Sequence, residues 1–219
     1  MSIKRDKRKK AEKKIQNNKK NSQAKELNQK EIQNGIIKLF DPSKLTTPKS
    51  INHDIKIFCK TISNFDPFFV HIEPEPWSRQ SCCDLNIHEY IKINGGKIIC
   101  GYKIWYNKPN YIEAERHAIW FKDGKYKDIT FNSDGEENIL FIPDVLEKQN
   151  TLEKNKSRIR WGKNSKTKQL IKAQNNMEKI MPMQQISDKE SWDTMLTYEE
   201  WKSGKRMSNI QIETANKSE

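Results

Sequence analysis

The sequence is short of apolar residues, cysteines and long hydrophobic runs. Only 34% of its 219 residues are hydrophobic, whereas 32% are charged, so the compact part of the protein must be smaller than the whole chain. Four cysteines are too few for a disulfide scaffold, and no apolar run approaches the roughly 20 residues of a membrane-spanning helix. The charged N-terminus also lacks the apolar stretch of a secretory signal. We therefore expect a cytoplasmic protein with reduced thiols and no membrane partner.

Charge divides the chain into three regions. The formal net charge is +12, and residues 1 to 30 carry 12 basic and 3 acidic side chains, whereas residues 66 to 144 carry 9 and 13. This pattern predicts a basic tail and linker over residues 1–49, disordered or helical, a compact domain over 50–144, and a charged helical segment over 145–219. The basic flanks have two interpretations, which are solvated helices or arms that bind nucleic acid, with Trp161 as a stacking platform.

The compact region shows mostly β-strand patterns. Short runs rich in Ile, Tyr, Phe and Trp are separated by turn residues, and Asp123-Gly124 is a strong two-residue hairpin signal. One helix is expected over 84–93, closed by Gly95-Gly96. The fold class is thus α+β, a small antiparallel sheet with a helix that carries a cysteine at its N-terminus. Strands are predicted for residues 55–60, 68–77, which run into prolines, 97–106, 110–122, 125–131 and 137–144.

Two adjacent cysteines precede the predicted helix, and the second is the candidate nucleophile. Cys83 stands at the helix entrance, where backbone N–H groups and the helix dipole favour a negatively charged sulfur. A thiol reacts as its thiolate, so this position suits an activated cysteine. Cys82 is interpreted as incidental.

The partner imidazole is His117, and Asp128 is the carboxylate expected to orient it. A two-residue turn at Asp123-Gly124 would pair residue 122 with 125 and so on down to 117 with 130. Alternate positions share a face, so Asp128 would lie diagonal to His117. Asp128 would then hold one ring nitrogen while the other faces the thiol, as a Cys-His-Asp triad requires.

Two further acidic residues leave an alternative open. Glu113 and Glu115 alternate with His117 on the same strand and would line the same face. They would suit a cationic or amine-bearing substrate, or would replace Asp128 as orienter. Cys83, His117 and Glu115 would otherwise form a zinc site, although no CxxC or HxxxH pair supports one. The expectation is no metal or other cofactor, with zinc as the alternative.

Residues 70–144 contain a series of short motifs: a cysteine followed three residues later by Asn, a Gly-Gly pair, a Gly-aromatic-x-x-Trp strand, Glu-Ala-Glu-x-His-Ala-x-Trp, Asp-x-Thr and Leu-Phe-x-Pro-Asp. In these motifs the region resembles a group of little-characterised bacterial and phage proteins that often carry a SEC-C motif. The core of that group looks like the transglutaminase-like and papain-like cysteine superfamily. The resemblance selects Cys83 and not Cys82. The Cys-rich SEC-C segment itself is missing, so the zinc of that motif is not carried over, and Ile119 separates His117-Ala118 from Trp120.

The resemblance implies a cysteine-dependent hydrolase or acyltransferase that acts on an acyl or amide substrate through a thioester. Cys83, His117 and Asp128 would be catalytic. The alternative is a non-enzymatic protein that binds nucleic acid or another protein, or a metal-binding domain. Binding or orienting roles are expected for Asn86, Trp105, Glu113, Glu115 and Trp120.

Overall fold

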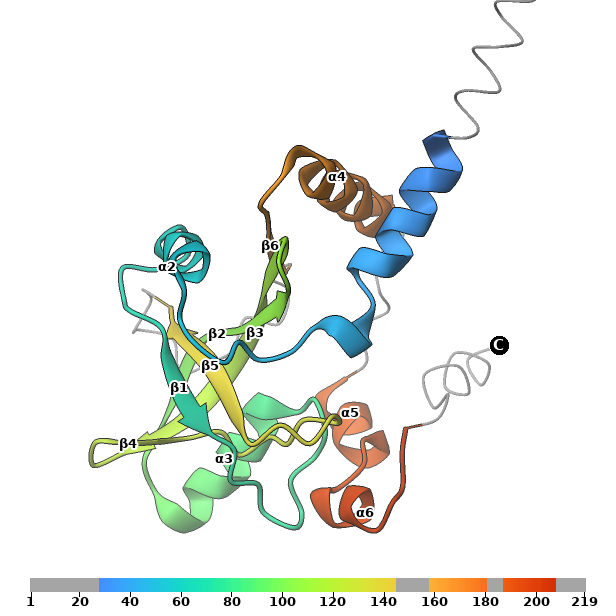
Figure 1. Cartoon of the computed structure of the whole chain (residues 1–219). Coiled ribbons are helices and arrows are strands. Elements are labelled where there is room, and N and C mark those ends of the chain that lie inside the picture. The colour runs from blue at the N-terminus through green and yellow to red at the C-terminus, as the bar shows by residue number, and fades with distance from the viewer. Residues whose placement is uncertain (1–27, 145–157, 181–186, 208–219) are drawn as a thin grey trace, which may run out of the picture.

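The structure, a computed structural model, describes residues 28–144, 158–180 and 187–207 (Figure 1). It confirms the α+β class, with helices around an antiparallel sheet. Residues 28 to 39 form a helix. The elements that follow are η1 (Pro42–Lys44), α2 (His53–Lys60), β1 (Phe68–His71), α3 (Cys83–Asn94), β2 (Lys97–Asn107), β3 (Tyr111–Lys122), β4 (Lys125–Lys127), β5 (Asn138–Pro143), β6 (Ile159–Gly162), α4 (Ser165–Ile180), α5 (Asp188–Thr194) and α6 (Tyr198–Lys202).

The sheet is built on the long hairpin of β2 and β3. Its strand order is β1-β5-β2-β3-β4, and β6 pairs with a different part of β3 from the part that pairs with β4. All the strand pairs are antiparallel. The strands predicted at β1, β2, β3 and β5 are confirmed, as is the turn at Asp123-Gly124 that pairs Lys122 with Lys125. Gly101 lies opposite His117, and a Cβ there would come within 2.2 Å of the Ile142 carbonyl oxygen. Glycine thus lets β5 approach β2 beside the candidate histidine.

The two faces of the sheet have different coverings. Even-numbered side chains of β2 and β3 pack against both α2 and α3, in two clusters that include Ile104 with Phe58 and Trp120 with Ile87. Because side chains alternate along a strand, His117 and the other odd-numbered residues of β3 point to the opposite face. On that face Ile119 packs with Phe131 and Phe141.

One predicted strand is wrong. Residues 55–60, which alternate in hydrophobicity, belong to the helix α2. The Asn52 side chain accepts a hydrogen bond from the Ile55 N–H at 3.0 Å, which caps the helix, and Ile55, Phe58 and Cys59 are buried. These positions fit a helix at i, i+3 and i+4 as well as they fit a strand, and the asparagine cap favours the helix.

Contacts in the structure cross both predicted region boundaries, at residues 50 and 144. The packed structure begins before residue 50, because the Leu39 carbonyl accepts a hydrogen bond from Asn107 at 2.9 Å and the Phe40 ring contacts Tyr111 at 5.0 Å between centroids. After residue 144, the described chain does not begin with a helix. It adds the strand β6 to the edge of β3 before α4. Further along, Thr197 and Glu200 form a capping box at the start of α6.

No helix within the described ranges is long and apolar enough to cross a membrane. The most basic part of the chain, residues 1 to 27, lies outside those ranges. The predicted nucleic-acid arm therefore remains a prediction for that segment. In the described part, Trp161 is partly buried against the core cluster between the sheet and α2, and its predicted stacking role stays a prediction.

Candidate active site

His117 and Asp128 form a buried pair on the odd-numbered face of the sheet. His117 Nε2 lies 2.8 Å from Asp128 Oδ2, and the exposed fractions of the two residues are 8% and 0%. The other carboxylate oxygen, Oδ1, accepts a hydrogen bond from the Thr130 N–H at 2.8 Å. Both oxygens of Asp128 are therefore fixed, which holds the imidazole in one orientation.

Asp128 reaches His117 by a route that differs from the predicted one. Antiparallel pairing with β3 ends at Lys127, so the pairings predicted for residues 128, 129 and 130 with β3 are wrong. Asp128 pairs in parallel with Ile72: its N–H donates to the His71 carbonyl at 3.0 Å, and its carbonyl accepts from the Glu73 N–H at 2.8 Å. The sheet curls until the ends of β1 and β4 meet, and these bonds satisfy the buried backbone of Asp128.

The edge of β3 beside His117 has a gap between strands. β6 pairs with Tyr111–Ala114 and β4 with residues 120–122, so residues 115–119 have no strand neighbour on this edge among the described strands. The first residue of α3, Cys83, packs in the cluster on the even-numbered face, yet it lies close enough to His117, on the odd-numbered face, to raise the pKa of that imidazole. This combination indicates that the thiol lies at the edge of β3, in the gap.

Cys83 is the first residue of the 12-residue helix α3, with Cys82 at the N-cap position. The Cys82 side chain makes no capping hydrogen bond to the backbone N–H groups in the first turn of α3. Cys83 is 7% exposed. Since Asp128 lies against Nε2, the ring nitrogen left to face the thiol is Nδ1.

The charges of the site favour an imidazolium. Burial lowers the pKa of His117, but the charges of Asp128 and Cys83, together with hydrogen bonds to both, raise it from 6.5 to about 10. At neutral pH the ring therefore carries a proton between a carboxylate and a sulfur. This is the charge state in which a thiolate is most strongly stabilised.

The protonation of His117 can be observed directly. We expect its imidazole to stay charged to about pH 10 and to lose its proton at lower pH in Asp128→Asn, because that change removes the negative charge that raises the pKa of His117. The measurement is an NMR titration of the ring ¹⁵N shifts. Asp123→Asn, in the turn of the same hairpin, is the matched control and should leave the titration unchanged. A midpoint near 6.5 in the wild type would contradict the pairing.

Asn86 joins the segments that carry the three residues. It is fully buried, its Oδ1 accepts from the Arg79 N–H at 2.7 Å, and its Nδ2 donates to the Arg79 carbonyl at 2.8 Å and to Thr130 Oγ1 at 3.0 Å. Thr130 in turn holds Asp128. Asn86 thus links the loop before α3, α3 itself and the segment after Asp128, and its predicted orienting role stays a prediction.

Removing this link should weaken the fold. Asn86→Ala leaves the buried backbone N–H and carbonyl of Arg79 without their partner, so we expect the free energy of unfolding to fall by about 2 to 4 kcal/mol. Urea denaturation followed by tryptophan fluorescence measures it. Asn94→Ala, which removes one hydrogen bond at 3.2 Å at the other end of α3, is the control and should cost less. Equal effects of the two changes would contradict this role.

The two predicted tryptophans lie in different places. Trp120 contacts the far end of α3, where its Nε1 donates to the Gly95 carbonyl at 2.8 Å and its ring meets Tyr90 edge-on at 5.3 Å. Trp120 thus contacts the C-terminal end of the helix and belongs to the same core cluster as Cys83. Trp105 donates from Nε1 to Glu115 Oε2 at 2.8 Å, and its ring lies 3.8 Å from the ammonium of Lys103.

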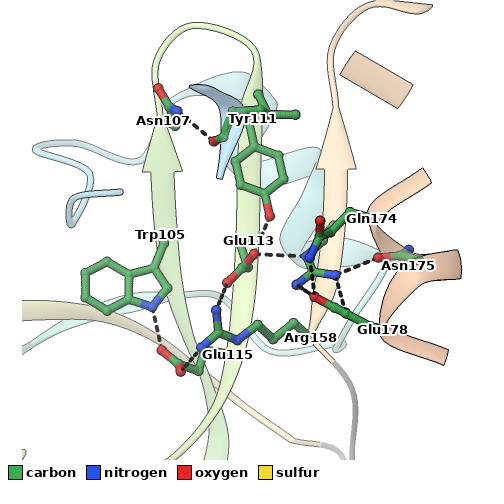
Figure 2. A network of polar contacts seen from close by, with 11 residues as sticks. Trp105, Asn107, Tyr111, Glu113, Glu115, Arg158, Gln174, Asn175 and Glu178 are labelled. Atoms are coloured by element: carbon green, nitrogen blue, oxygen red, sulfur yellow. Dashed lines mark hydrogen bonds and ion pairs between the residues drawn. The ribbon is translucent and has the colours of Figure 1, made fainter. Parts of the chain in front are cut away.

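Glu113 and Glu115 belong to an ionic network next to the site, and neither orients His117 (Figure 2). Glu113 accepts hydrogen bonds from Arg158 Nη1 at 2.9 Å, from Arg160 Nε at 3.0 Å and from the Tyr111 hydroxyl. Arg158 Nη2 also binds Glu115 at 2.8 Å. Since arginines already pair with these carboxylates, the structure gives no support to an amine-binding role for them.

The alternative metal ligands are engaged elsewhere. Across residues 28–144, 158–180 and 187–207, no group of three or more His, Cys, Asp or Glu side chains is arranged to hold a metal ion. In the set considered from the sequence, Glu115 bonds to Trp105 and Arg158, and His117 bonds to Asp128. Zinc binding therefore remains an untested alternative, which metal analysis of the purified protein would decide.

The sequence interpretation missed Lys103, which is 3% exposed on the same face as His117. Its ammonium donates to Asn132 Oδ1, and burial lowers its pKa although the charges of Asp128 and Glu115 act in the opposite direction. Lys103 is the one charged residue in the run 98–106, which was the available signal. Lys103 places a buried positive charge among the carboxylates of the site.

Comparison with known proteins adds no family to this picture. No protein-family model, no curated protein and no solved structure matches the chain significantly, so any assignment depends on the geometry of Cys83, His117 and Asp128.

Proposed function

We propose that this protein is a cysteine-dependent hydrolase or acyltransferase, with Cys83 as nucleophile, His117 as general base and acid, and Asp128 as the residue that orients His117. The observation that supports it best is the continuous contact from Asp128 through His117 to Cys83 at the start of α3. A packed cysteine needs neither a charged imidazole nor a fixed carboxylate, whereas an activated thiol uses both.

The proposed reaction proceeds in two halves. The Cys83 sulfur attacks the carbonyl carbon of an ester or amide, and the C–O⁻ of the tetrahedral intermediate would accept a hydrogen bond from the N–H of Cys83, a helix-terminal amide. As the carbonyl re-forms, the bond to the leaving group breaks and His117 gives that group its proton. The product is a thioester on Cys83. Water or an amine, deprotonated by His117, then attacks the thioester and releases the thiol.

The first test is selective labelling. We expect iodoacetamide to modify Cys83 before the three other cysteines, because Cys83 alone contacts an imidazolium among the described thiols. Burial raises the pKa of Cys59 to about 12 and that of Cys100 to about 11, which makes both slow. Peptide mapping by mass spectrometry identifies the site. Cys83→Ala should abolish fast labelling and Cys82→Ala should keep it, so fast labelling that persists in Cys83→Ala would reject the assignment.

A further inference from the structure

The C-terminal residues 187–206, here called the cover, lie along the loop that leads into α3. The cover comprises α5, the extended link 195–197 and α6. The Gln80 N–H donates to the Leu196 carbonyl at 2.9 Å, and the Tyr198 N–H donates to the Ser78 carbonyl at 2.8 Å. Arg79 and Thr197 form an antiparallel bridge between these two bonds. The extended link is therefore paired with residues 78–80 as one strand pairs with another.

The cover also contacts the segment that carries Asp128. The rings of Tyr198 and Trp201 stack at 5.9 Å and pack on Phe131 at 5.4 Å and 5.6 Å. Trp201 Nε1 donates to the Ser133 carbonyl at 3.3 Å. One short segment thus connects the loop before Cys83 with the loop after Asp128.

The cover comes close to the thiol. Ser191 Oγ lies 3.4 Å from the sulfur of Cys82, the residue next to Cys83, and the Trp192 ring contacts Trp77 at 6.4 Å. Figure 1 shows α5 beside the start of α3. Because Cys83 is only 7% exposed, a substrate carbonyl reaches it only if neighbouring residues move.

The cover is the neighbour best suited to move. Its helices have seven and five residues, and neither contains a buried residue. Leu196, in the link, is 8% exposed and is its one buried hydrophobic residue. Elements with few buried apolar contacts open at low free-energy cost, without unfolding of the domain.

We propose that the cover is displaceable and that the backbone edge of residues 78–80 beneath it binds the extended chain of a polypeptide acyl donor. This inference rests on the proposed function. The bonds of the link to Ser78 and Gln80 are made by main-chain groups, which every extended polypeptide carries, so another chain can replace the link by β-augmentation. The edge ends three residues before Cys83, which brings the carbonyls of a paired chain towards the thiol.

A reversible lock tests the displacement. Ser191→Cys, in the full chain, places a second thiol against Cys82 and should form a disulfide on oxidation that a reductant opens. The background carries Cys83→Ala, which prevents competing disulfides and catalysis, and Trp201→Ala, which weakens the cover. A fluorescein-labelled peptide with the wild-type sequence of residues 187–206 is the probe, and its binding is followed by fluorescence anisotropy.

We expect the peptide to bind the reduced protein at least tenfold more tightly than the oxidised, locked protein. Cys82→Ser in the same background cannot form the lock and should bind equally under both conditions. Absence of binding to the reduced protein, or equal binding to both forms, would overturn the inference. Labelling of Cys83 in otherwise wild-type protein separates the two proposals: a reactive Cys83 without peptide binding rejects the polypeptide site alone, and an unreactive Cys83 rejects the proposed function.

Discussion

Replacing His117 with alanine is expected to slow the alkylation of Cys83 by iodoacetamide at pH 6 on the order of tenfold. The reacting species is the thiolate, and at pH 6 a cysteine without a cationic partner is almost entirely protonated. His117 places a positive charge beside the Cys83 sulfur, and a neighbouring cation favours the thiolate form of a cysteine. The gain in rate is smaller than the gain in thiolate, because a less basic thiolate is also a weaker nucleophile.

The pH dependence separates this effect from a general loosening of the site. As the pH approaches about 10, His117 loses its proton and ordinary thiols ionise, so the rates of wild type and variant should converge. A variant that only opens the structure would react faster at every pH. His88→Ala changes an exposed histidine in the middle of α3, the helix that begins at Cys83. This variant is the control and should follow the wild-type profile. Identical profiles of wild type and His117→Ala would show that the imidazole does not activate the thiol.

Local sequence patterns predicted the parts of the site that depend on one strand or one helix. Alternation placed His117 on a single face of β3, and the Asp-Gly turn set the register as far as Lys127. The contact of Asp128 with His117 was predicted correctly, but through a hairpin that continues past residue 127. The actual position depends on the end of β1, more than fifty residues earlier, and hairpin spacing contains no information about that pairing.

The elements that the sequence did not predict are held by long-range polar contacts. Residues 158–162 have too few apolar positions to read as a strand, yet β6 forms because Arg158 and Arg160 bind the carboxylates of β3. From the sequence alone, Glu113 and Glu115 are interpreted as substrate contacts, because a carboxylate near a histidine with no visible partner suggests chemistry. Charge pairs between distant segments follow no local period, so only the structure identifies them.

The network around Glu113 should therefore matter more for stability than for reactivity. The side chains of Glu113 and Arg160 are 1% and 4% exposed, and Glu113 also accepts from the buried Tyr111 hydroxyl. Glu113→Leu leaves the Tyr111 hydroxyl without this acceptor and removes one of the two carboxylates that bind Arg160. We expect the free energy of unfolding to fall by about 3 to 5 kcal/mol. Urea denaturation with an unchanged m-value measures this loss.

Two matched variants decide which part of the network carries that energy. Glu178→Gln alters the other carboxylate that binds Arg160, but at a side chain that is 42% exposed, so we expect a loss below about 1 kcal/mol. Adding Tyr111→Phe to Glu113→Leu removes the hydroxyl that has lost its hydrogen-bond acceptor. The double variant should recover about 1 to 3 kcal/mol of the free energy of unfolding. If Glu113→Leu left stability unchanged and instead lowered the labelling rate of Cys83, Glu113 would act on the thiol site, and its pairing with the arginines would not be its main role.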